Sequence, residues 1–280
     1  TIQSSDVNAI NEQAGIRSVC VHEDVFFVLQ RALYFAELTD GAYDPTIGPL
    51  VELWNIKGEE SKAEHTIPKE EEILKALKKV DYKKLQLLDG NKVFLKDKGM
   101  MVDLGGIVKG YAADEVKRIL NEKGVKSAIA DIGGNIYACG SKPSGEDWKI
   151  GLRNPFKSNG EYAGIINVSD TSIVTSGDYE RYFELNGKRY HHILSTTTGY
   201  PVQNELSAVS VITPNSIDGD ALSTALFVLG TEKGTKLLKN YSNDVEAFYF
   251  TKDKSIYVPP KLKSKFELVN DEFSIIDNVY

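Results

Sequence analysis

The chain has 280 residues, of which 41% are hydrophobic and 26% charged, a composition that excludes disordered and fibrous proteins. Its 33 basic and 40 acidic residues leave a net charge of −7. This balance argues against a nucleic-acid partner, because binding a phosphate backbone requires a concentrated basic face. No stretch approaches the roughly 20 apolar residues that cross a bilayer. The cysteines Cys20 and Cys139 form no metal-binding motif, and the sequence leaves open whether they form a disulfide or remain two inert thiols.

The first half of the chain predicts helices, a hairpin and a short strand. Apolar residues recur at helical spacing over residues 23–39, and the pattern ends at the turn signal Asp40-Gly41. The segment that follows contains two prolines and a glycine, which exclude a long helix and indicate a shaped loop. The later elements are expected to be a charged helix after Pro68, a hairpin turning at Asp89-Gly90-Asn91, and a short strand over residues 100–104 that runs into Gly105-Gly106.

The second half mixes strands and helices without a regular alternation. An amphipathic helix over residues 108–123 is expected to end at Gly124, and a buried strand over residues 127–140 is interrupted by Gly133-Gly134. The remaining predicted elements are strands at 148–155 and on both sides of Asp170-Thr171, a hairpin over 181–194, a strand over 205–213, helices over 218–230 and 231–241, and a closing hairpin over 246–258. This order predicts a mixed α/β (α+β) fold in two lobes rather than a doubly wound sheet.

Several familiar catalytic motifs are absent from the sequence. It contains no GxxxxGK[ST], no GxGxxG after a strand, no HExxH and no GxSxG. Histidine occurs only at positions 22, 65, 191 and 192, so a zinc site of three histidines would need help from carboxylates. The absence of these motifs argues against four classes of enzyme: P-loop nucleotide hydrolases, dinucleotide dehydrogenases, zinc proteases and serine hydrolases.

A carboxylate and a hydroxyl lie four residues apart in the predicted helix over 218–230. Asp220 and Thr224 therefore share one helix face, about 6 Å apart at Cβ, and can together bind a hard cation such as Mg²⁺ or Ca²⁺. Both lie in the first turns, where the helix dipole also favours an anion. The common alternative is a helix cap, in which Asp218 or Asp220 accepts backbone N–H bonds and Thr224 bonds back along the helix.

The segment VDLGGIVKGYAAD joins a predicted strand to a predicted helix. Asp103 ends the strand, two glycines allow another group to approach the backbone, and Lys109 lies near the start of the helix. Free amides, a helix N-terminus and a lysine together can bind phosphate. A tight turn with a surface lysine explains the same pattern, and the residues alone do not decide between the two.

Two further segments carry groups with chemical potential. Gly133-Gly134 marks either a bulge or a close approach by a ligand, and the structural explanation is the more common one. The run Thr175-Ser176-Gly177-Asp178 offers small donors next to a turn. His191 and His192 alternate faces of a strand, so one can point into a site where a neutral imidazole acts as a general base. A histidine in a strand is more often only a satisfied polar group.

Taken together and in order, these segments resemble the FAD:protein FMN transferase family, also known as the thiamine-biosynthesis lipoprotein family. The matching segments run from near Ser4 to about Val258 and are SSDVNAIN, DGAYDPTIGPLVELW, VDLGGIVKGYAAD, ADIGGNIYACG, TSGDYERYF, RYHHIL with TGYP, and DGDALSTALFVLG. The first of them normally lies some way inside the mature protein. The chain therefore resembles a family member that lacks its signal, its lipobox and its first structural elements.

The resemblance implies a fold and a reaction. The fold is a two-lobed, T-fold-like domain of sheets and helices that spans residues 1–280, with the flavin nucleotide site between the lobes. The reaction takes FAD as substrate, requires Mg²⁺, transfers the FMN half to a threonine hydroxyl of a target flavoprotein, and releases AMP. The rivals that remain are a Mg²⁺-dependent FAD pyrophosphatase, in which water replaces the threonine, and a flavin-binding protein without catalysis.

The resemblance also implies roles for individual residues. Its metal ligands map onto Asp220, Thr224 and the backbone carbonyl of Gly106, and Asp220 is counted with the catalytic residues. Its FAD contacts map onto Ala42, Tyr43, Asp44, Asp103, Lys109, His192 and Ile193. His192 lies beside the reacting phosphate in this interpretation and is the candidate base. Many members continue the histidine motif with an Asp-Pro pair, where this chain has Ser195-Thr196.

Phosphate binding in an acidic protein requires local positive charge. Mg²⁺, Lys109 and the N-termini of two helices are expected to supply it. The expected partners are FAD and a flavoprotein with an acceptor threonine, and a membrane is involved only through a lipid anchor that this chain lacks. The family is mostly lipid-anchored outside the cytoplasmic membrane, so an extracytoplasmic location, in the periplasm or on the outer cell surface, is expected.

Overall fold

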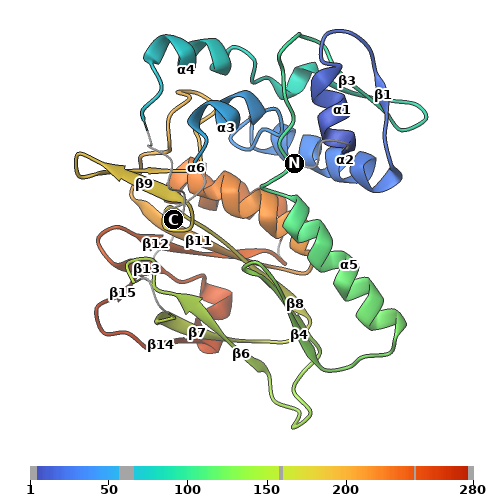
Figure 1. The fold of residues 1–280 in the computed structure, drawn as a ribbon. Coiled ribbons are helices and arrows are strands. Elements are labelled where there is room, and N and C mark those ends of the chain that lie inside the picture. Colours follow the sequence, from blue (N-terminus) through green and yellow to red (C-terminus); the bar gives the residue numbers. More distant parts are fainter. Residues whose placement is uncertain (1–4, 57–65, 158–159, 243, 277–280) are drawn as a thin grey trace. The chain divides into compact units, whose positions relative to one another are not determined.

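The computed structural model describes residues 5–56, 66–157, 160–242 and 244–276, which form two compact units. Unit 1 contains the described residues of Thr1–Gly106 and Glu180–Val202, and unit 2 those of Ile107–Tyr179 and Gln203–Tyr280. Helices and sheets occur in both units, which confirms the predicted mixed α/β fold (Figure 1). That the two units act as one enzyme domain stays a prediction.

Unit 1 combines short helices with two small antiparallel sheets. Its helices are α1 (Asp6–Glu12), α2 (Glu23–Leu38), α3 (Gly48–Trp54), α4 (Glu70–Leu77) and the 3-10 turn η1 (Tyr82–Lys84). One sheet has the order β1-β3-β2, and its strands are β1 (Val19–Cys20), β2 (Leu85–Leu88) and β3 (Lys92–Leu95). The second is the predicted hairpin of β9 (Tyr182–Leu185) and β10 (Lys188–His191), which turns at Asn186-Gly187.

The predicted strand over residues 100–104 is not formed. The segment contributes only a single bridge, between Met101 and Ile47. Its backbone is held instead by a side chain, because the N–H of Val102 donates to Asn11 Oδ1 (2.7 Å) and Asn11 Nδ2 donates to the carbonyl of Val102 (3.1 Å). The Asn11 amide takes the place of a neighbouring strand, so an extended segment exists without a sheet ladder.

Unit 2 is built on a seven-stranded sheet of order β15-β13-β12-β11-β8-β5-β4. Its strands are β4 (Ala128–Ile132), β5 (Asn135–Cys139), β8 (Thr171–Gly177), β11 (Leu206–Thr213), β12 (Glu246–Thr251), β13 (Ser255–Tyr257) and β15 (Ser274–Ile276). A smaller sheet has the order β14-β7-β6, with β6 (Trp148–Arg153), β7 (Tyr162–Val168) and β14 (Phe266–Leu268). The helices are α5 (Val108–Glu122), α6 (Ser216–Tyr241) and the 3-10 helix η2 (Pro260–Lys265).

The predicted strand over residues 127–140 is a hairpin, not one interrupted strand. β4 and β5 pair antiparallel, and Gly133 and Gly134 form the two-residue turn between them. Both glycines have positive φ, 59° and 94°, as a type I′ hairpin turn requires. The chain therefore reverses direction at the glycines, where a bulge would have let the strand continue.

Successive side chains along the strands of the seven-stranded sheet point alternately to its two faces, which pack against different parts of unit 2. In β8, Ile173 joins a core of apolar residues from both sheets, whereas its neighbour Val174 points to the opposite face, against Gly219 of α6. All eight residues of the central strand β11 are buried, because α6 covers one of its faces and this inter-sheet core covers the other. Figure 1 shows α6 running along the sheet, and its first turns lie on the face that Val174 presents.

Helix α6 consists of two helical segments joined at Gly230, which has φ 76° and ψ 178°. This confirms the prediction of separate helices over 218–230 and 231–241. Glu205 caps the N-terminus of the second segment: its carboxylate accepts hydrogen bonds from the N–H (2.8 Å) and the hydroxyl (2.9 Å) of Thr231.

Within the described residues, no helix has both the length and the apolar composition that crossing a membrane requires. Both cysteines are free thiols, Cys20 exposed and Cys139 buried.

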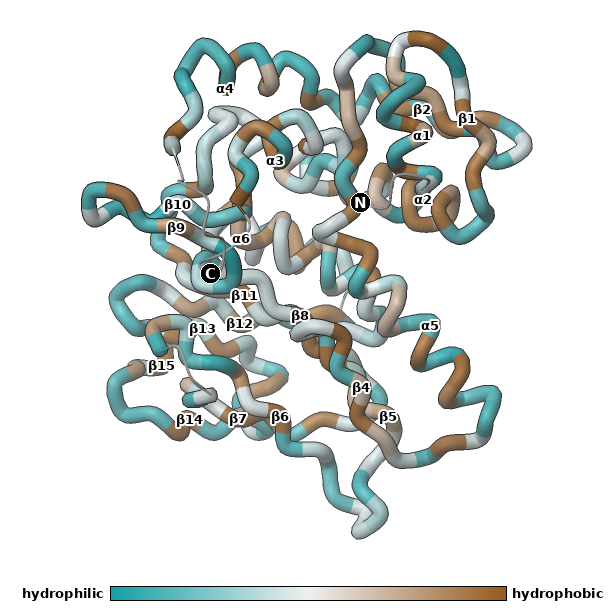
Figure 2. Tube along the Cα trace, viewed as in Figure 1, coloured by the Kyte–Doolittle hydropathy of each residue, from teal (hydrophilic) through white to brown (hydrophobic). Residues whose placement is uncertain are grey.

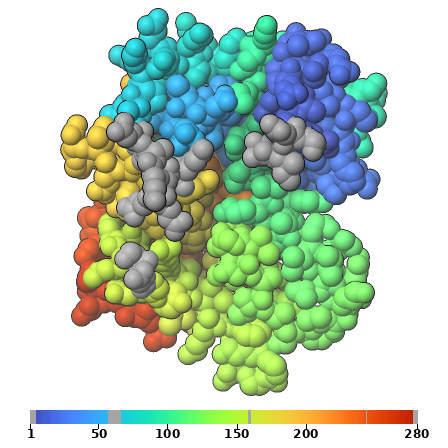
Figure 3. Space-filling view, viewed as in Figure 1, coloured from blue at the N-terminus to red at the C-terminus, as the bar shows by residue number. Residues whose placement is uncertain are grey.

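The starts of α5 and α6 touch at Gly110. A Cβ at this position would lie 2.3 Å from the carbonyl oxygen of Ser216 and 2.6 Å from the Cα of Ile217, so no larger residue fits without moving a helix. Apolar and polar residues alternate along the rest of α5 (Figure 2), and part of this helix lies at the molecular surface (green in Figure 3). The close approach at Gly110 sets the spacing of the two helices that carry Lys109 and Asp220.

Replacing Gly110 by alanine tests this close approach. In an open helix interior, alanine would stabilise by about 1 kcal/mol relative to glycine. Here the added Cβ meets backbone atoms, and such overpacking costs about 1–3 kcal/mol or more. We therefore expect Gly110→Ala to lower the free energy of unfolding in urea by about 2 kcal/mol. An unchanged or higher free energy of unfolding would contradict the contact.

Candidate functional site

In unit 2, helices α5 and α6 cap each other at their N-termini. Asp114 of α5 accepts hydrogen bonds from the N–H groups of Ser216 (2.8 Å) and Ile217 (2.9 Å) at the start of α6. In the other direction, Asp220 of α6 accepts the N–H of Gly110 in the first turn of α5 at 2.9 Å. Each helix thus uses a carboxylate of the other to satisfy amides that no helical turn can satisfy.

This arrangement narrows the expectation that the amides of two helix N-termini bind phosphate, which stays a prediction for the remaining amides. The N–H groups of Gly110, Ser216 and Ile217 already donate to carboxylates of the chain itself. It also shows that the cap and the metal-ligand interpretations of Asp220 are compatible. Asp220 caps a helix, but through Oδ2 and on α5 rather than on its own helix.

The carboxyl group of Asp220 is almost completely buried, with 3% of the residue exposed. Burial raises its pKa above the ordinary value, while the positive charge of Lys109 and the N–H of Gly110 act in the opposite direction. Lys109 reaches this region from the first turn of α5, and its Cδ would lie 3.9 Å from a Cβ placed on Gly133 in the β4–β5 turn. The structure therefore brings the predicted residues Lys109 and Asp220 together.

Three hydroxyl groups lie beside Asp220. Ser176 of β8 contacts Ser223 at 2.8 Å and Thr224 at 3.4 Å, measured between the side-chain oxygens. The hydroxyls of Ser223 and Thr224 also donate to the carbonyl of Asp220, at 3.0 and 3.4 Å. Both contacts of the Thr224 hydroxyl are long, so this oxygen is weakly held in its own helix. Ser176 belongs to the predicted run of small donors, and it lies near the end of β8, just before the turn at residues 178–179.

The donor set of this group suits a hard divalent cation. It consists of a carboxylate and hydroxyls, the oxygen ligands that Mg²⁺ and Ca²⁺ prefer. Among the residues that the structure describes, no three His, Cys, Asp or Glu side chains gather into a metal-binding cluster of their own. A cation held by this one carboxylate and the hydroxyls would therefore keep coordination positions open for water or phosphate oxygens. The third expected ligand, the carbonyl of Gly106, belongs to unit 1, and its role stays a prediction.

In unit 1, the loop after α2 carries three of the predicted FAD contacts. Asp44 is buried, and its Oδ1 accepts hydrogen bonds from the N–H and the hydroxyl of Thr46, both at 2.7 Å. Its Oδ2 accepts the N–H of Tyr82 at 3.0 Å. Burial raises the pKa of this carboxyl, and the bonds to Thr46 and Tyr82 lower it. Asp44 thus shapes the loop that presents the half-buried Ala42 and the buried Tyr43.

Asp103 is joined to this same loop. Its N–H donates to the carbonyl of Pro45 at 2.8 Å, and its Oδ1 accepts the N–H of Gly105 at 2.8 Å in a tight turn. The turn explains why a glycine follows, since a Cβ at Gly105 would lie 2.9 Å from that carboxylate oxygen. The backbone of the predicted segment Asp103 to Gly106 is therefore ordered by its own carboxylate.

The two adjacent histidines have different hydrogen bonds. His191 is buried: its Nδ1 accepts the N–H of Ile193 (3.3 Å), and its Nε2 then donates to the carbonyl of Val202 (2.9 Å). The half-buried His192 places Nδ1 at 3.2 Å from the carbonyl of Arg181. A carbonyl only accepts, so Nδ1 of His192 carries the proton and its neutral ring has the lone pair on Nε2.

The loop after the histidines shows how Ser195-Thr196 stands in for an Asp-Pro pair. Ser195 Oγ accepts the N–H groups of Thr197 (3.3 Å) and Thr198 (3.2 Å), as an aspartate would in an Asx turn. The hydroxyl of Thr196 donates to the carbonyl of Gly41 at 2.7 Å. The departure from the family pattern therefore keeps the turn. It also ties the histidine loop to the loop that carries Ala42, Tyr43 and Asp44.

The predicted residues thus form two groups, one in each unit. Unit 1 joins the 42–44 loop, Asp103 and the His192–Ile193 segment through the bonds at Pro45 and Gly41. Unit 2 joins Lys109, Asp220 and Thr224. Sequence reasoning assigned no role to Asn11 or Asp114, although both lie in segments that carry the family resemblance.

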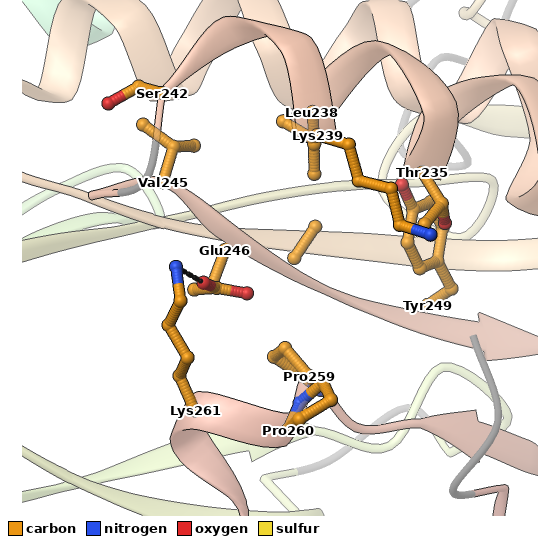
Figure 4. A pocket seen from close by; sticks show the side chains of 11 residues that line it. Thr235, Leu238, Lys239, Ser242, Val245, Glu246, Tyr249, Pro259, Pro260 and Lys261 are labelled. Carbon is orange, nitrogen blue, oxygen red and sulfur yellow. Dashed lines mark ion pairs between the residues drawn. The ribbon is translucent and has the colours of Figure 1, made fainter. Parts of the chain in front are cut away.

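A cavity of about 470 Å³ lies elsewhere in unit 2, beside the second segment of α6 (Figure 4). Lys261 and Glu246 form an ion pair of 2.8 Å there. The lining residues are Thr235, Leu238, Lys239, Ser242, Val245, Glu246, Ala247, Tyr249, Pro259, Pro260 and Lys261. None of the predicted site residues lines this cavity, so it does not mark the candidate site.

Comparison with known proteins decides the family. The family model of the ApbE family matches residues 1–249. The chain belongs to the ApbE family. Among ApbE relatives, the FAD:protein FMN transferase of Klebsiella pneumoniae (strain 342) is 38% identical over 274 residues, covering 98% of this chain and 83% of the relative. The FAD:protein FMN transferase of Treponema pallidum (strain Nichols) is 36% identical over 283 residues, covering 96% and 77%.

Solved ApbE structures resemble this one. The ApbE protein from Thermotoga maritima MSB8 matches with a TM-score of 0.86 and 35% identity, covering 95% of this chain and 84% of that chain. The flavin transferase ApbE from Vibrio cholerae matches with a TM-score of 0.77 and 30% identity, covering 89% and 78%. These matches confirm that the fold is that of the ApbE flavin transferases.

The bond from Thr196 to Gly41 predicts a measurable contribution to stability. Thr196→Val keeps the shape of the side chain and leaves the Gly41 carbonyl without this donor. We expect the free energy of unfolding to fall by about 1 kcal/mol. The control is Thr197→Val, which removes an exposed hydroxyl that contacts Ser195 within its own turn. Equal losses in the two variants, measured by urea unfolding, would contradict a specific link between the two loops.

Proposed function

We propose that the protein transfers the FMN moiety of FAD to a threonine hydroxyl of a target flavoprotein, releases AMP, and depends on Mg²⁺. Family membership and the names of its relatives support flavin transfer. The observation that carries the Mg²⁺ dependence is the group of oxygens around Asp220 and Thr224, with the positive charge of Lys109 close to Asp220. We infer an extracytoplasmic location from the family resemblance alone.

The reaction exchanges a phosphoanhydride linkage of FAD for a phosphodiester linkage to the acceptor threonine. The bond between the FMN phosphorus and the bridging oxygen of the diphosphate breaks, and a bond forms between that phosphorus and the threonine Oγ. AMP leaves with the bridging oxygen, and the threonine hydroxyl loses its proton. Bound Mg²⁺ supplies positive charge at the diphosphate oxygens, where negative charge gathers in the transition state.

Residues of this chain have distinct parts in the proposed reaction. Asp220 and Thr224 hold the cation, and Lys109 adds a second positive charge for the phosphates. His192 takes the threonine proton at Nε2, because its Nδ1 proton is committed to the carbonyl of Arg181. His191 is unsuited to this role, since it is buried and both of its ring nitrogens are bonded to the backbone.

The proposal is tested by mass spectrometry of an acceptor flavoprotein, prepared without flavin, after incubation with the protein, FAD and Mg²⁺. The expected product is an acceptor carrying one FMN on a threonine, together with AMP. FMN and AMP without a modified acceptor would overturn transfer in favour of FAD hydrolysis. Bound FAD without AMP release would overturn catalysis. In Asp220→Asn we expect transfer to fall at least about 100-fold.

The Asp220→Asn variant keeps an oxygen that accepts the N–H of Gly110, so we expect its melting temperature to stay close to that of the native protein. The matched control is Glu115→Gln, which removes one carboxylate from an exposed ion pair with Arg118 on α5. This control is expected to retain full transfer activity. Full Mg²⁺-dependent transfer by Asp220→Asn would contradict the assigned cation site.

The two histidines give a second prediction. His192→Gln removes the proton acceptor, and the transfer rate at saturating FAD is expected to fall about 10²–10⁴-fold. His191→Gln is expected to act through stability, because it disturbs two buried hydrogen bonds. Its melting temperature falls, and the rate per folded molecule stays within a few-fold. A His192→Gln rate within tenfold of the native rate would remove His192 as the base.

A further inference from the structure

Asn135 begins strand β5 and lies directly under the first turns of α6. It is fully buried (0% exposed) and pairs with Val174 of β8. Directly paired residues of antiparallel strands point to the same face of the sheet. Val174 faces α6, because a Cβ on Gly219 would lie 2.8 Å from its Cγ2. The Asn135 side chain therefore points toward the helix that carries Asp220.

The side-chain amide of Asn135 has no hydrogen-bond partner at either Nδ2 or Oδ1 among the residues that the structure describes. It nevertheless lies close enough to Asp220 to lower the pKa of that carboxyl. A buried polar group without a partner costs about 1–3 kcal/mol. The β4–β5 hairpin does not require an amide at this position, since its ladder is formed by backbone groups. We therefore expect Nδ2 and Oδ1 of Asn135 to gain hydrogen-bond partners in the ligand-bound protein.

The chemistry of the neighbouring group shows which partners fit. Nδ2 is a donor, and the ionised carboxylate of Asp220 is an acceptor within its reach. Oδ1 is an acceptor, so its partner must donate. A water molecule bound to a cation donates only, because its lone pair is directed at the metal, and Mg²⁺ usually keeps several such waters. In many proteins, side chains that do not bind the metal themselves form hydrogen bonds to its ligands and so orient those ligands.

We propose that Asn135 is a positioning residue of the cation site: its Nδ2 holds the Asp220 carboxylate in place, and its Oδ1 accepts a hydrogen bond from a water on the bound Mg²⁺. This role rests on the proposed function, because it concerns the same cation. It assigns Asn135 no contact with the reacting atoms. The residue acts through Asp220 and through the hydration of the ion.

The test is Asn135→Leu, which keeps a similar volume and removes both polar atoms. Isothermal titration with Mg²⁺ at saturating FAD is expected to show a dissociation constant raised about 10–100-fold. Without Mg²⁺, the melting temperature is expected to be equal to or higher than that of the native protein, because an unsatisfied amide has been removed. A purely structural asparagine gives the opposite pair of results.

The matched control is Asn154→Leu. Asn154 is also fully buried in unit 2, but its Oδ1 accepts the N–H of Phe156 at 2.9 Å. We expect this variant to lose stability and to keep the native Mg²⁺ dissociation constant. A dissociation constant of Asn135→Leu within threefold of the native value overturns the proposal. If the leucine variant does not fold, Asn135→Ala is measured in the same way and judged by the same limits.

The titration separates this inference from the proposed function because it requires no turnover. A native protein that binds Mg²⁺ with FAD but modifies no acceptor overturns flavin transfer and leaves the comparison of Asn135 variants valid. A native protein that transfers FMN, together with an Asn135→Leu variant of native Mg²⁺ affinity, overturns the role of Asn135 alone.

Discussion

The hydrogen bond from the N–H of Gly110 to Asp220 is the interaction on which the candidate site depends. It joins residues 110 positions apart and exists only because a glycine lets the starts of α5 and α6 approach closely. The return bonds from Ser216 and Ile217 to Asp114 hold the same junction from the other side. A buried carboxylate, beside a lysine that favours its charged form, is thereby fixed with one oxygen bonded to the backbone.

This junction also explains how an acidic chain can bind a dinucleotide with two phosphates. The N–H groups of Gly110, Ser216 and Ile217 are already bonded to carboxylates, so the proposed site takes positive charge from a cation and from Lys109. The surrounding oxygens come from Thr224, Ser223 and Ser176, and they suit Mg²⁺ better than a soft metal. Binding a cation would favour the ionised form of Asp220 and offset the cost of its burial.

Most of the elements could be predicted from local patterns, because helical periodicity and turn residues act over a few positions. The helix after Gly106 and the turn at Asn186-Gly187 are examples. The β4–β5 hairpin could not be, since two glycines in an apolar run allow either a bulge or a reversal, and pairing of β5 with β8 decides between them. The segment after Gly99 was predicted as a strand but does not form one, because the side chain of Asn11 takes the place of the neighbouring strand.

Within the site, helical periodicity placed Asp220 and Thr224 on one face, but their relation to Lys109 needed the family resemblance. The reciprocal caps and the amide of Asn135 depend on contacts between distant segments that no local pattern contains.

The central claim is that Asp220 and Thr224 hold a divalent cation at the diphosphate of FAD. Its most direct test is the anomalous difference density of crystals soaked with FAD and Mn²⁺, which replaces Mg²⁺ and scatters anomalously. The account predicts a single strong peak within coordination distance of the Asp220 carboxylate and the Thr224 hydroxyl, next to the phosphates. FAD bound in full, with no peak at these two residues and Asp220 bonded only to Gly110, would contradict it.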